Sequence, residues 1–190
     1  MICPSHGLIW RRKEDIERIL TLYKKWANYQ TDNKAVIIYV YDSMWGSTEK
    51  MALKLFELLE RENIPVRLIK LKNTDYTVGI TEILEAKFIL VGSPVLNNNI
   101  FPQVAGFLTY MKGLKPKKRY SFCFGSYGWS KVGFRDLEQS LQDLGIELIS
   151  EGRYFQYIPS SQELESLKEI VVRIKEILKS YFLGKEQVYE

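Results

Sequence analysis

The sequence predicts an α/β fold in which a doubly wound, five-stranded parallel sheet carries helices on both faces. Two observations lead to this fold class. Short, almost wholly apolar runs of strand length alternate along the chain with longer segments whose apolar residues have helical spacing. The apolar runs are typical of strands buried on both faces, as in a parallel sheet covered by helices. Right-handed crossovers then distribute the helices over both faces of the sheet.

Length and composition narrow the class of protein further. A chain of 190 residues is long enough for one sizeable domain and an appendage, and its hydrophobic content of 46% argues against disorder. The formal net charge of +4 permits an acidic partner but gives no indication of nucleic acid, and we expect none. No apolar run approaches the roughly 18 residues of a membrane helix, and residues 1–7 lack the apolar core of a signal peptide. We therefore expect a cytoplasmic protein without a membrane partner.

Residues 1–33 are expected to form an N-terminal extension or linker that precedes a domain over residues 34–182 and a tail over residues 183–190. The apolar spacing predicts an amphipathic helix over residues 15–26, with basic residues around it. Such a helix either packs on the main domain with a solvated basic face or docks onto a partner. Both interpretations fit the pattern.

The main domain begins with a continuous apolar, β-branched run. It predicts the first strand over residues 35–41, and the helical spacing of the next apolar residues predicts a helix over 47–61. An alternating segment over 65–71 indicates an edge strand. A short helix over 81–86 then leads to a third apolar strand over 87–92.

The second half repeats this rhythm. Gly145 is placed to end a helix in the C′ position. The predicted elements are a helix over 101–111, a strand over 120–125, a helix over 131–144, a fifth strand over 146–150 and a last helix over 162–182.

The residues that follow the strands are the candidates for function, because ligands of doubly wound sheets bind beyond the carboxyl ends of the strands where the strand order reverses. The first such segment is a hydroxyl-rich turn that leads into a helix, and the exposed N–H groups of a helix start attract phosphate. It matches neither the Walker pattern nor GxGxxG, which disfavours nucleotide hydrolysis and removes the dinucleotide fingerprint. Its residues are Ser43, Met44, Trp45, Gly46, Ser47 and Thr48.

Two more loops have the chemistry to hold a flat, polar ring. The loop after the third strand is rich in asparagine amides, and the loop after the fourth strand has two aromatic residues beside a glycine. Each loop alone also fits a simpler role as a turn, a helix cap or packing. Together the three loops predict one site for a ligand with a phosphate and a planar ring. The residues added by these two loops are Ser93, Pro94, Val95, Leu96, Asn97, Asn98, Ser126, Tyr127, Gly128 and Trp129.

These motifs together resemble the flavodoxin-like domain of flavodiiron proteins, also called A-type flavoproteins. The resemblance rests on residues 43–52, on Gly92–Pro94 with Asn97, on Phe101-Pro102 and on residues 124–129, and it covers about residues 34–150. It implies the flavodoxin-like strand order 2-1-3-4-5 and FMN as the cofactor. The phosphate would be held by Ser43 and the turn that follows, and the isoalloxazine ring by residues 93–98 and 126–129.

The resemblance also implies redox partners. Residues 3–11, which contain the one histidine of the chain, His6, resemble the segment that ends the family's diiron domain. In the family the matching histidine is an iron ligand. The metallo-β-lactamase-like diiron domain itself has no counterpart in this sequence, so His6 is either a surface histidine or completes a metal site in trans. The implied partners are a rubredoxin-like donor and a separate diiron-domain protein, and a homodimer is plausible from the family's head-to-tail dimers.

Three hypotheses for function follow. The first is an FMN-binding electron carrier, standalone or split off from a flavodiiron-type oxygen or nitric oxide reductase, in which no residue acts as acid or base because the flavin does the chemistry. The second is an NAD(P)H-dependent FMN or quinone reductase on the same fold, which needs room beside the flavin for its substrate. The third is an interaction module without a flavin, against which the intact loops argue.

Overall fold

A parallel sheet in the predicted order forms the centre of the protein. The computed structural model describes residues 1–28, 32–40 and 45–186, with the backbone alone over 32–40 and 181–186. The strand order is β2-β1-β3-β6-β7, β8 also pairs with β6, and every one of these pairs is parallel. The strands are β1 (Asp32–Val40), β2 (Val66–Lys70), β3 (Ala86–Gly92), β6 (Tyr120–Tyr127), β7 (Glu147–Leu148) and β8 (Arg153–Gln156). The order 2-1-3-4-5 and the α/β class are thereby confirmed.

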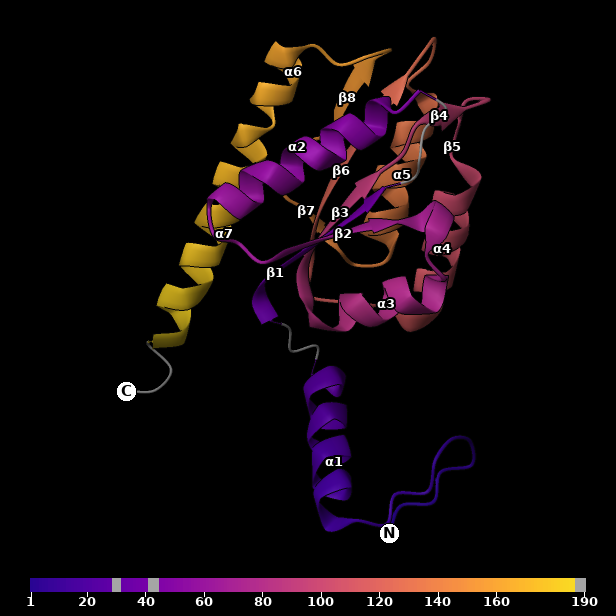
Figure 1. Ribbon diagram of the computed structural model, residues 1–190, viewed down its shortest axis with the longest axis vertical. Helices are drawn as coiled ribbons and strands as arrows, with labels where there is room; N and C mark the ends of the chain where they lie inside the picture. The colour runs from indigo at the N-terminus through magenta and orange to yellow at the C-terminus, as the bar shows by residue number, and fades with distance from the viewer. Residues whose placement is uncertain (29–31, 41–44, 187–190) are drawn as a thin grey trace.

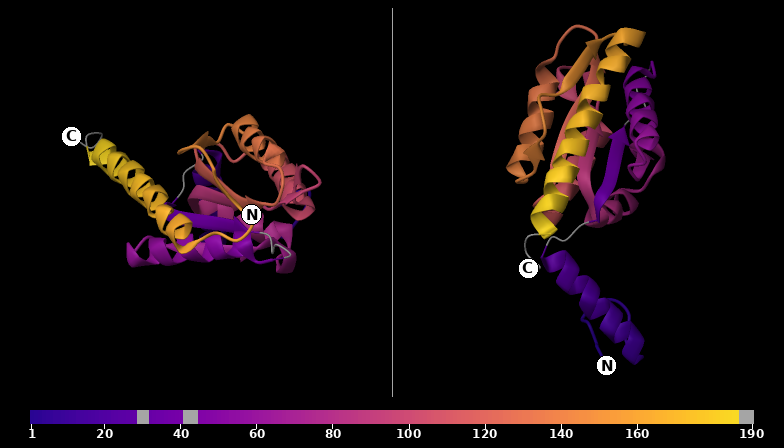
Figure 2. Two further views of the ribbon diagram at one scale, coloured as in Figure 1. Left: turned by 90° about the horizontal axis from the view of Figure 1, so that it is seen from above. Right: turned by 90° about the vertical axis from the view of Figure 1, so that its left-hand side faces the viewer.

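Helices cover both faces of this sheet (Figures 1 and 2). One face lies under α2, α6 and α7, and the other lies under α3, α4 and α5. The helices are α1 (Lys13–Ala27), α2 (Ser47–Arg61), α3 (Tyr76–Glu85), α4 (Pro102–Leu114), α5 (Val132–Asp143), α6 (Ser161–Ser166) and α7 (Lys168–Glu186). Gly145 follows α5 with a φ of +72°, as expected of a C′ residue.

The alternation of side chains along the central strands divides the apolar interior into two cores. In β3, Phe88 and Leu90 pack with α2 and α7, whereas Ile89 and Val91 pack with α3, α4 and α5. All four side chains are fully buried. Burying each contributes about 1.5–3 kcal/mol, so the central strands anchor both helical layers.

Two elements differ from the predicted helices. The helix predicted over 81–86 begins earlier, as α3 at Tyr76, because the Asp75 side chain accepts a hydrogen bond of 2.8 Å from the Thr77 N–H and caps the first turn. The helix predicted over 162–182 is divided at Leu167, which is the C-cap of α6. Its second part, α7, continues to Glu186, which lies within the stretch 183–190 that the sequence suggests as a tail.

The predicted fifth strand is also divided. Only Glu147 and Leu148 of residues 146–150 pair with β6 there, and the chain returns to the same strand as β8 from Arg153 to Gln156. Pairing with β6 therefore continues to Tyr127, whose partner is Gln156. The return brings a further loop to the carboxyl end of the sheet.

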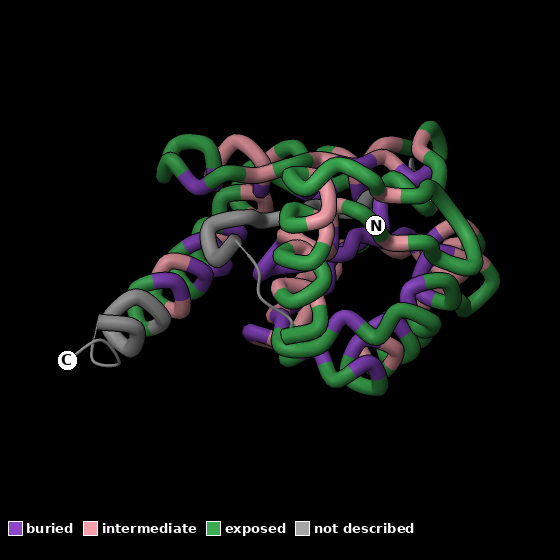
Figure 3. Tube along the Cα trace, turned by 90° about the horizontal axis from the view of Figure 1, so that it is seen from below, coloured by how far each residue is buried: buried purple, intermediate pink, exposed green. Residues whose placement is uncertain are grey.

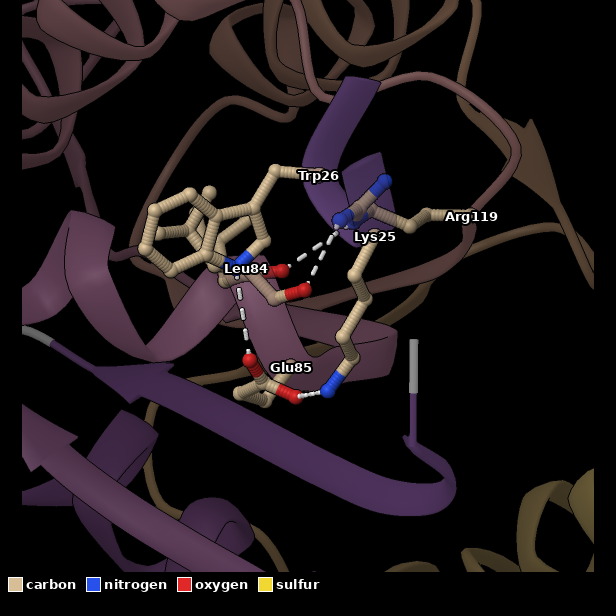
Figure 4. A network of polar contacts seen from close by, with 6 residues as sticks. Lys25, Trp26, Leu84, Glu85 and Arg119 are labelled. Carbon is tan, nitrogen blue, oxygen red and sulfur yellow. Dashed lines mark hydrogen bonds and ion pairs between the residues drawn. The ribbon is translucent and has the colours of Figure 1, made fainter. Parts of the chain in front are cut away.

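Helix α1 contacts the domain through its last turn. Lys25 forms an ion pair with Glu85, and the Trp26 indole N–H donates to the Glu85 carboxylate over 3.4 Å (Figure 4). No residue of α1 is buried (Figure 3), and the helix extends away from the end of the sheet where β3 begins (Figure 1). No helix within the described ranges is long and apolar enough to cross a membrane.

Arg119 lies beside this contact and holds the end of α3. Its guanidinium donates to the carbonyl oxygens of Ile83 at 3.1 Å and Leu84 at 3.2 Å, and only 4% of the residue is exposed. These carbonyls belong to the last turn of α3, where intrahelical N–H partners run out; the C-cap Ala86 N–H also donates to Ile83.

Replacing Arg119 with alanine is expected to lower the free energy of unfolding by about 2–3 kcal/mol, because partly buried carbonyls lose a charged donor. Urea denaturation measures the effect. Arg119→Lys retains the charge but loses the planar fork and is expected to be only partly tolerated. Lys117→Ala, at an exposed neighbour, serves as the control and is expected to change stability by less than about 0.5 kcal/mol; equal losses for Arg119→Ala and Lys117→Ala would contradict the assignment.

Candidate functional site

A cavity of about 360 Å³ lies at the carboxyl ends of the strands. It is bounded by the start of α2, by the segment from Pro94 through the β4–β5 hairpin (β4, Val95–Leu96; β5, Asn99–Ile100) to Phe101, and by the loops after β6 and β8. The lining residues are Trp45, Ser47, Pro94, Val95, Leu96, Phe101, Ser126, Tyr127, Gly128, Trp129, Tyr157 and Ile158. The lining is mostly apolar and aromatic, with two serine hydroxyls.

The amino end of α2 lies at this cavity. Gly46 is its N-cap with φ +70°, a conformation that favours glycine, and as a glycine it has no side chain to cap the first turn. The first N–H groups of the helix therefore lack an intrahelical acceptor and favour an anion. The Thr48 hydroxyl lies 2.9 Å from the Ser126 hydroxyl in a buried contact, which ties the start of α2 to the end of β6.

Ser93 supports the cavity wall formed by the segment from Pro94 to Phe101 without lining the cavity itself. It is fully buried, and its hydroxyl donates to the Pro94 carbonyl over 2.8 Å and accepts from the Phe101 N–H over 3.0 Å. The two ends of the segment that contains the hairpin are thus joined through one hydroxyl. Asn97 and Asn98, with φ of +50° and +61°, form the two-residue turn between β4 and β5, a role for which asparagine is well suited.

The third wall is aromatic. The Tyr127 ring meets the Phe134 ring edge-on at a centroid distance of 6.2 Å, and the Lys131 ammonium lies 5.1 Å from the Tyr127 ring centroid. Trp129 and Trp45 are 94% and 80% exposed, so both indoles lie at the rim. A large exposed aromatic surface at a cavity is typical of a binding site.

Sequence reasoning missed the fourth wall. Tyr157 and Ile158 follow β8, and the Tyr157 N–H donates to the Tyr127 carbonyl over 2.8 Å. The Gln156 amide also donates to the Gly128 carbonyl over 2.8 Å, so the loops after β6 and β8 are joined. The signal was present as an aromatic run between Gly152 and Pro159, which has the length of a strand and the loop that follows it.

The structure brings most of the predicted site residues together. Those that line the cavity are Trp45, Ser47, Pro94, Val95, Leu96, Ser126, Tyr127, Gly128 and Trp129. Those that support it without lining it are Gly46, Thr48, Ser93, Asn97 and Asn98. Ser43 and Met44 lie outside the described residues.

The basic loop over residues 115–119 lies at the opposite end of the sheet. It precedes β6, whose far end is the Tyr127 wall, and the seven steps between the eight residues of this strand, at about 3.3 Å each, separate the two ends by about 23 Å. His6 is exposed in the N-terminal segment, where Ile2 and Trp10 pair as an antiparallel bridge. Within the described part of the chain, no group of three or more His, Cys, Asp or Glu side chains is placed to hold a metal.

A doubly wound sheet with a ligand cavity at the carboxyl ends of its strands defines a class of cofactor-binding α/β proteins. The flavodoxin family profile matches residues 40–170. The nitric oxide reductase of Moorella thermoacetica is 44% identical over 170 residues, which are 89% of this chain and 42% of that protein. Rubredoxin oxygen:oxidoreductase from Desulfovibrio gigas superposes with a TM-score of 0.85 at 35% identity, covering 94% of this chain and 44% of that one.

A flavodoxin from the domain Archaea has the same fold, with a TM-score of 0.67 at 23% identity over 76% of this chain and 98% of its own. The chain belongs to the flavodoxin family. It is a flavodoxin-like FMN domain homologous to the flavin module of flavodiiron proteins. It spans less than half the length of the nitric oxide reductase and the oxygen oxidoreductase it matches.

Replacing Ser93 with alanine is expected to lower the free energy of unfolding by about 1–2 kcal/mol, because the Phe101 N–H loses its acceptor in a partly buried position. Urea denaturation provides the measurement. Ser130→Ala removes an exposed hydroxyl that accepts from the Val132 N–H over 3.3 Å, and it serves as the matched control. If the two substitutions cost the same, Ser93 does not join the two ends of the segment that contains the hairpin.

Proposed function

We infer that the protein holds FMN in this cavity and transfers electrons between redox proteins, as the flavin module of a flavodiiron-type oxygen or nitric oxide reductase system. The observation that supports this most directly is the joint placement of two features. The uncapped amino end of α2 lies at the same cavity as the apolar walls that carry Tyr127 and Trp129. One feature suits a phosphate and the other a flat aromatic ring.

The start of α2 would hold the phosphate. Ser47 lines the cavity, Thr48 braces it through Ser126, and Gly46 gives the turn that leaves the N–H groups uncovered. Ser43, Met44 and Trp45 complete the same loop in the sequence. Phosphate binding at this position needs no lysine in the loop, because backbone N–H groups and hydroxyls provide the hydrogen-bond donors.

The remaining walls would hold the isoalloxazine ring. Pro94, Val95 and Leu96 form one side, and the segment from Ser126 to Trp129 forms another. Bound FMN provides the one- and two-electron chemistry, and the protein provides binding, orientation and access. The exposure of the Trp129 rim leaves a path for a redox partner to approach.

The partners follow from the relatives. One is described as a rubredoxin oxygen:oxidoreductase and another as a nitric oxide reductase. A rubredoxin-like protein would donate electrons and a diiron domain in a separate protein would receive them, and two copies of this chain would form a homodimer. The N-terminal segment and α1 would dock that domain, since Leu20 and Tyr23 are exposed apolar residues of a helix in which nothing is buried.

The first test is flavin binding. Titration with FMN is expected to quench flavin fluorescence and yield a yellow protein. Ser47→Glu is expected to weaken FMN by roughly 100-fold, because a carboxylate would occupy the anion position at the start of α2. Ser180→Glu makes the same change at an exposed site on α7 and serves as the control. A wild-type protein that remains colourless with excess FMN would overturn the proposal, and fast reduction by NADPH alone would indicate a reductase instead.

The second test is docking of the diiron domain. The full chain is expected to retain a purified diiron domain, such as that of the Moorella thermoacetica nitric oxide reductase, in a pulldown. Leu20→Asp with Tyr23→Asp is expected to reduce the captured amount at least tenfold, because charges would replace an apolar contact. Thr21→Asp adds one charge on the exposed side of the same helix and is expected to have little effect. Undiminished capture by the double variant would exclude this surface.

A further inference from the structure

Behind the Tyr127 wall lies a cluster of polar and aromatic side chains that do not line the cavity. Its centre is the pair of Tyr154, on β8, and Glu138, on α5. The Tyr154 hydroxyl donates to the Glu138 carboxylate over 2.6 Å, and the same carboxylate oxygen accepts from the Gly152 N–H over 3.1 Å. One carboxylate on α5 therefore holds the start of β8 at two points.

The fit around this pair is close. A Cβ atom on residue 152 would lie 2.2 Å from the Tyr154 hydroxyl. Residue 152 must therefore be a glycine for the tyrosine to pack against the backbone there. Burial, with Cys123 and Glu138 nearby, raises the pKa of Tyr154 far above its ordinary value. The phenol is therefore a permanent donor to Glu138. Burial likewise raises the pKa of the neighbouring Cys123 thiol, which stays neutral.

The cluster is connected to the cavity by ring contacts. The Tyr154 ring stacks on the buried Phe134 ring at a centroid distance of 3.7 Å with 10° between the planes. The other contact of Phe134 is the edge-on one with Tyr127, which lines the cavity. The rings of Tyr154, Phe134 and Tyr127 thus form a continuous row from α5 and β8 to the cavity wall.

The backbone provides a second connection. Strand β8 pairs with the end of β6, with Tyr154 opposite Gly125 and Gln156 opposite Tyr127. The loop that follows β8 donates the Tyr157 N–H to the Tyr127 carbonyl. The hydrogen bond from Tyr154 of β8 to Glu138 of α5 therefore holds two cavity walls in place. One contains Tyr127, and the other contains Tyr157 and Ile158.

We propose that Tyr154 and Glu138 are positioning residues for the isoalloxazine ring, which lock β8 to α5 and thereby hold the Tyr127 and Tyr157–Ile158 walls in place. The proposal deepens the function inferred above and rests on FMN binding in this cavity. Neither residue lines the cavity, so both act through their neighbours. The start of α2 is not part of the cluster, so we expect the lock to act on the ring contacts rather than on the phosphate contacts.

The test compares FMN with riboflavin, which has the ring but no phosphate. Tyr154→Phe keeps the ring and removes the donor, whereas Glu138→Leu removes the acceptor. Each is expected to raise the dissociation constants of both ligands by the same factor, roughly three- to tenfold, as expected for the loss of one buried hydrogen bond. Glu138→Gln retains an oxygen acceptor and is expected to remain within about twofold of wild type. Fluorescence titration gives the constants, and the residual fluorescence of the bound flavin reports how closely the walls contact it.

Asp143→Ala is the matched control on the same helix, because the Asp143 carboxylate accepts from Gln139 on the exposed face of α5. The melting temperature of each apoprotein shows whether it folds. If Glu138→Leu fails to fold, the comparison of Tyr154→Phe with Glu138→Gln decides. If wild type binds FMN and the dissociation constants of Tyr154→Phe are unchanged, this proposal alone is overturned. A loss of affinity for FMN but not for riboflavin overturns it as well. Wild type that binds neither ligand overturns the proposed function and this inference together.

Discussion

The burial of β3 and β6 on both faces is the constraint on which the remaining architecture depends. Both strands are almost wholly apolar, and no residue of β3 is exposed. Two helical layers are needed to cover them, and parallel pairing brings their carboxyl ends to one edge. The cavity follows from the strand order, because β1 is followed by α2 in one layer, whereas its neighbour β3 is followed by α4 in the other.

Hydrogen bonds within the protein give the cavity its shape. Ser93 joins the two ends of one wall, Thr48 and Ser126 join α2 to β6, and Tyr157 joins the loop after β8 to Tyr127. These contacts are made within the protein itself. The walls are therefore organised before any ligand arrives, which limits the conformational entropy lost on binding.

Local patterns were sufficient for the α/β class and for most of the cavity lining, because apolar runs mark buried strands and the residues after them lie at one edge. The strand order came from the family resemblance of the loop motifs. Local patterns were insufficient where tertiary contacts decide. Asn97 and Asn98 suggested ligand amides, yet they form a hairpin turn. Strand β8 was missed although its aromatic run has the length of a strand, and its pairing with β6 identifies it. A basic run such as residues 115–119 is typical of a charged surface, whereas the Arg119 side chain is buried against carbonyl oxygens of α3.

The attachment of α1 by a single turn has a mechanical consequence. With 15 residues at about 1.5 Å each, the helix is a rigid arm about 22 Å long, hinged where Lys25 and Trp26 meet Glu85. A tilt of about 10° at the hinge would move its far end by about 4 Å, given the length of such a helix. The segment that holds His6 joins α1 at that far end (Figure 1). The contacts of Lys25 and Trp26 with Glu85 thus help to set the position of the N-terminal segment relative to the flavin domain.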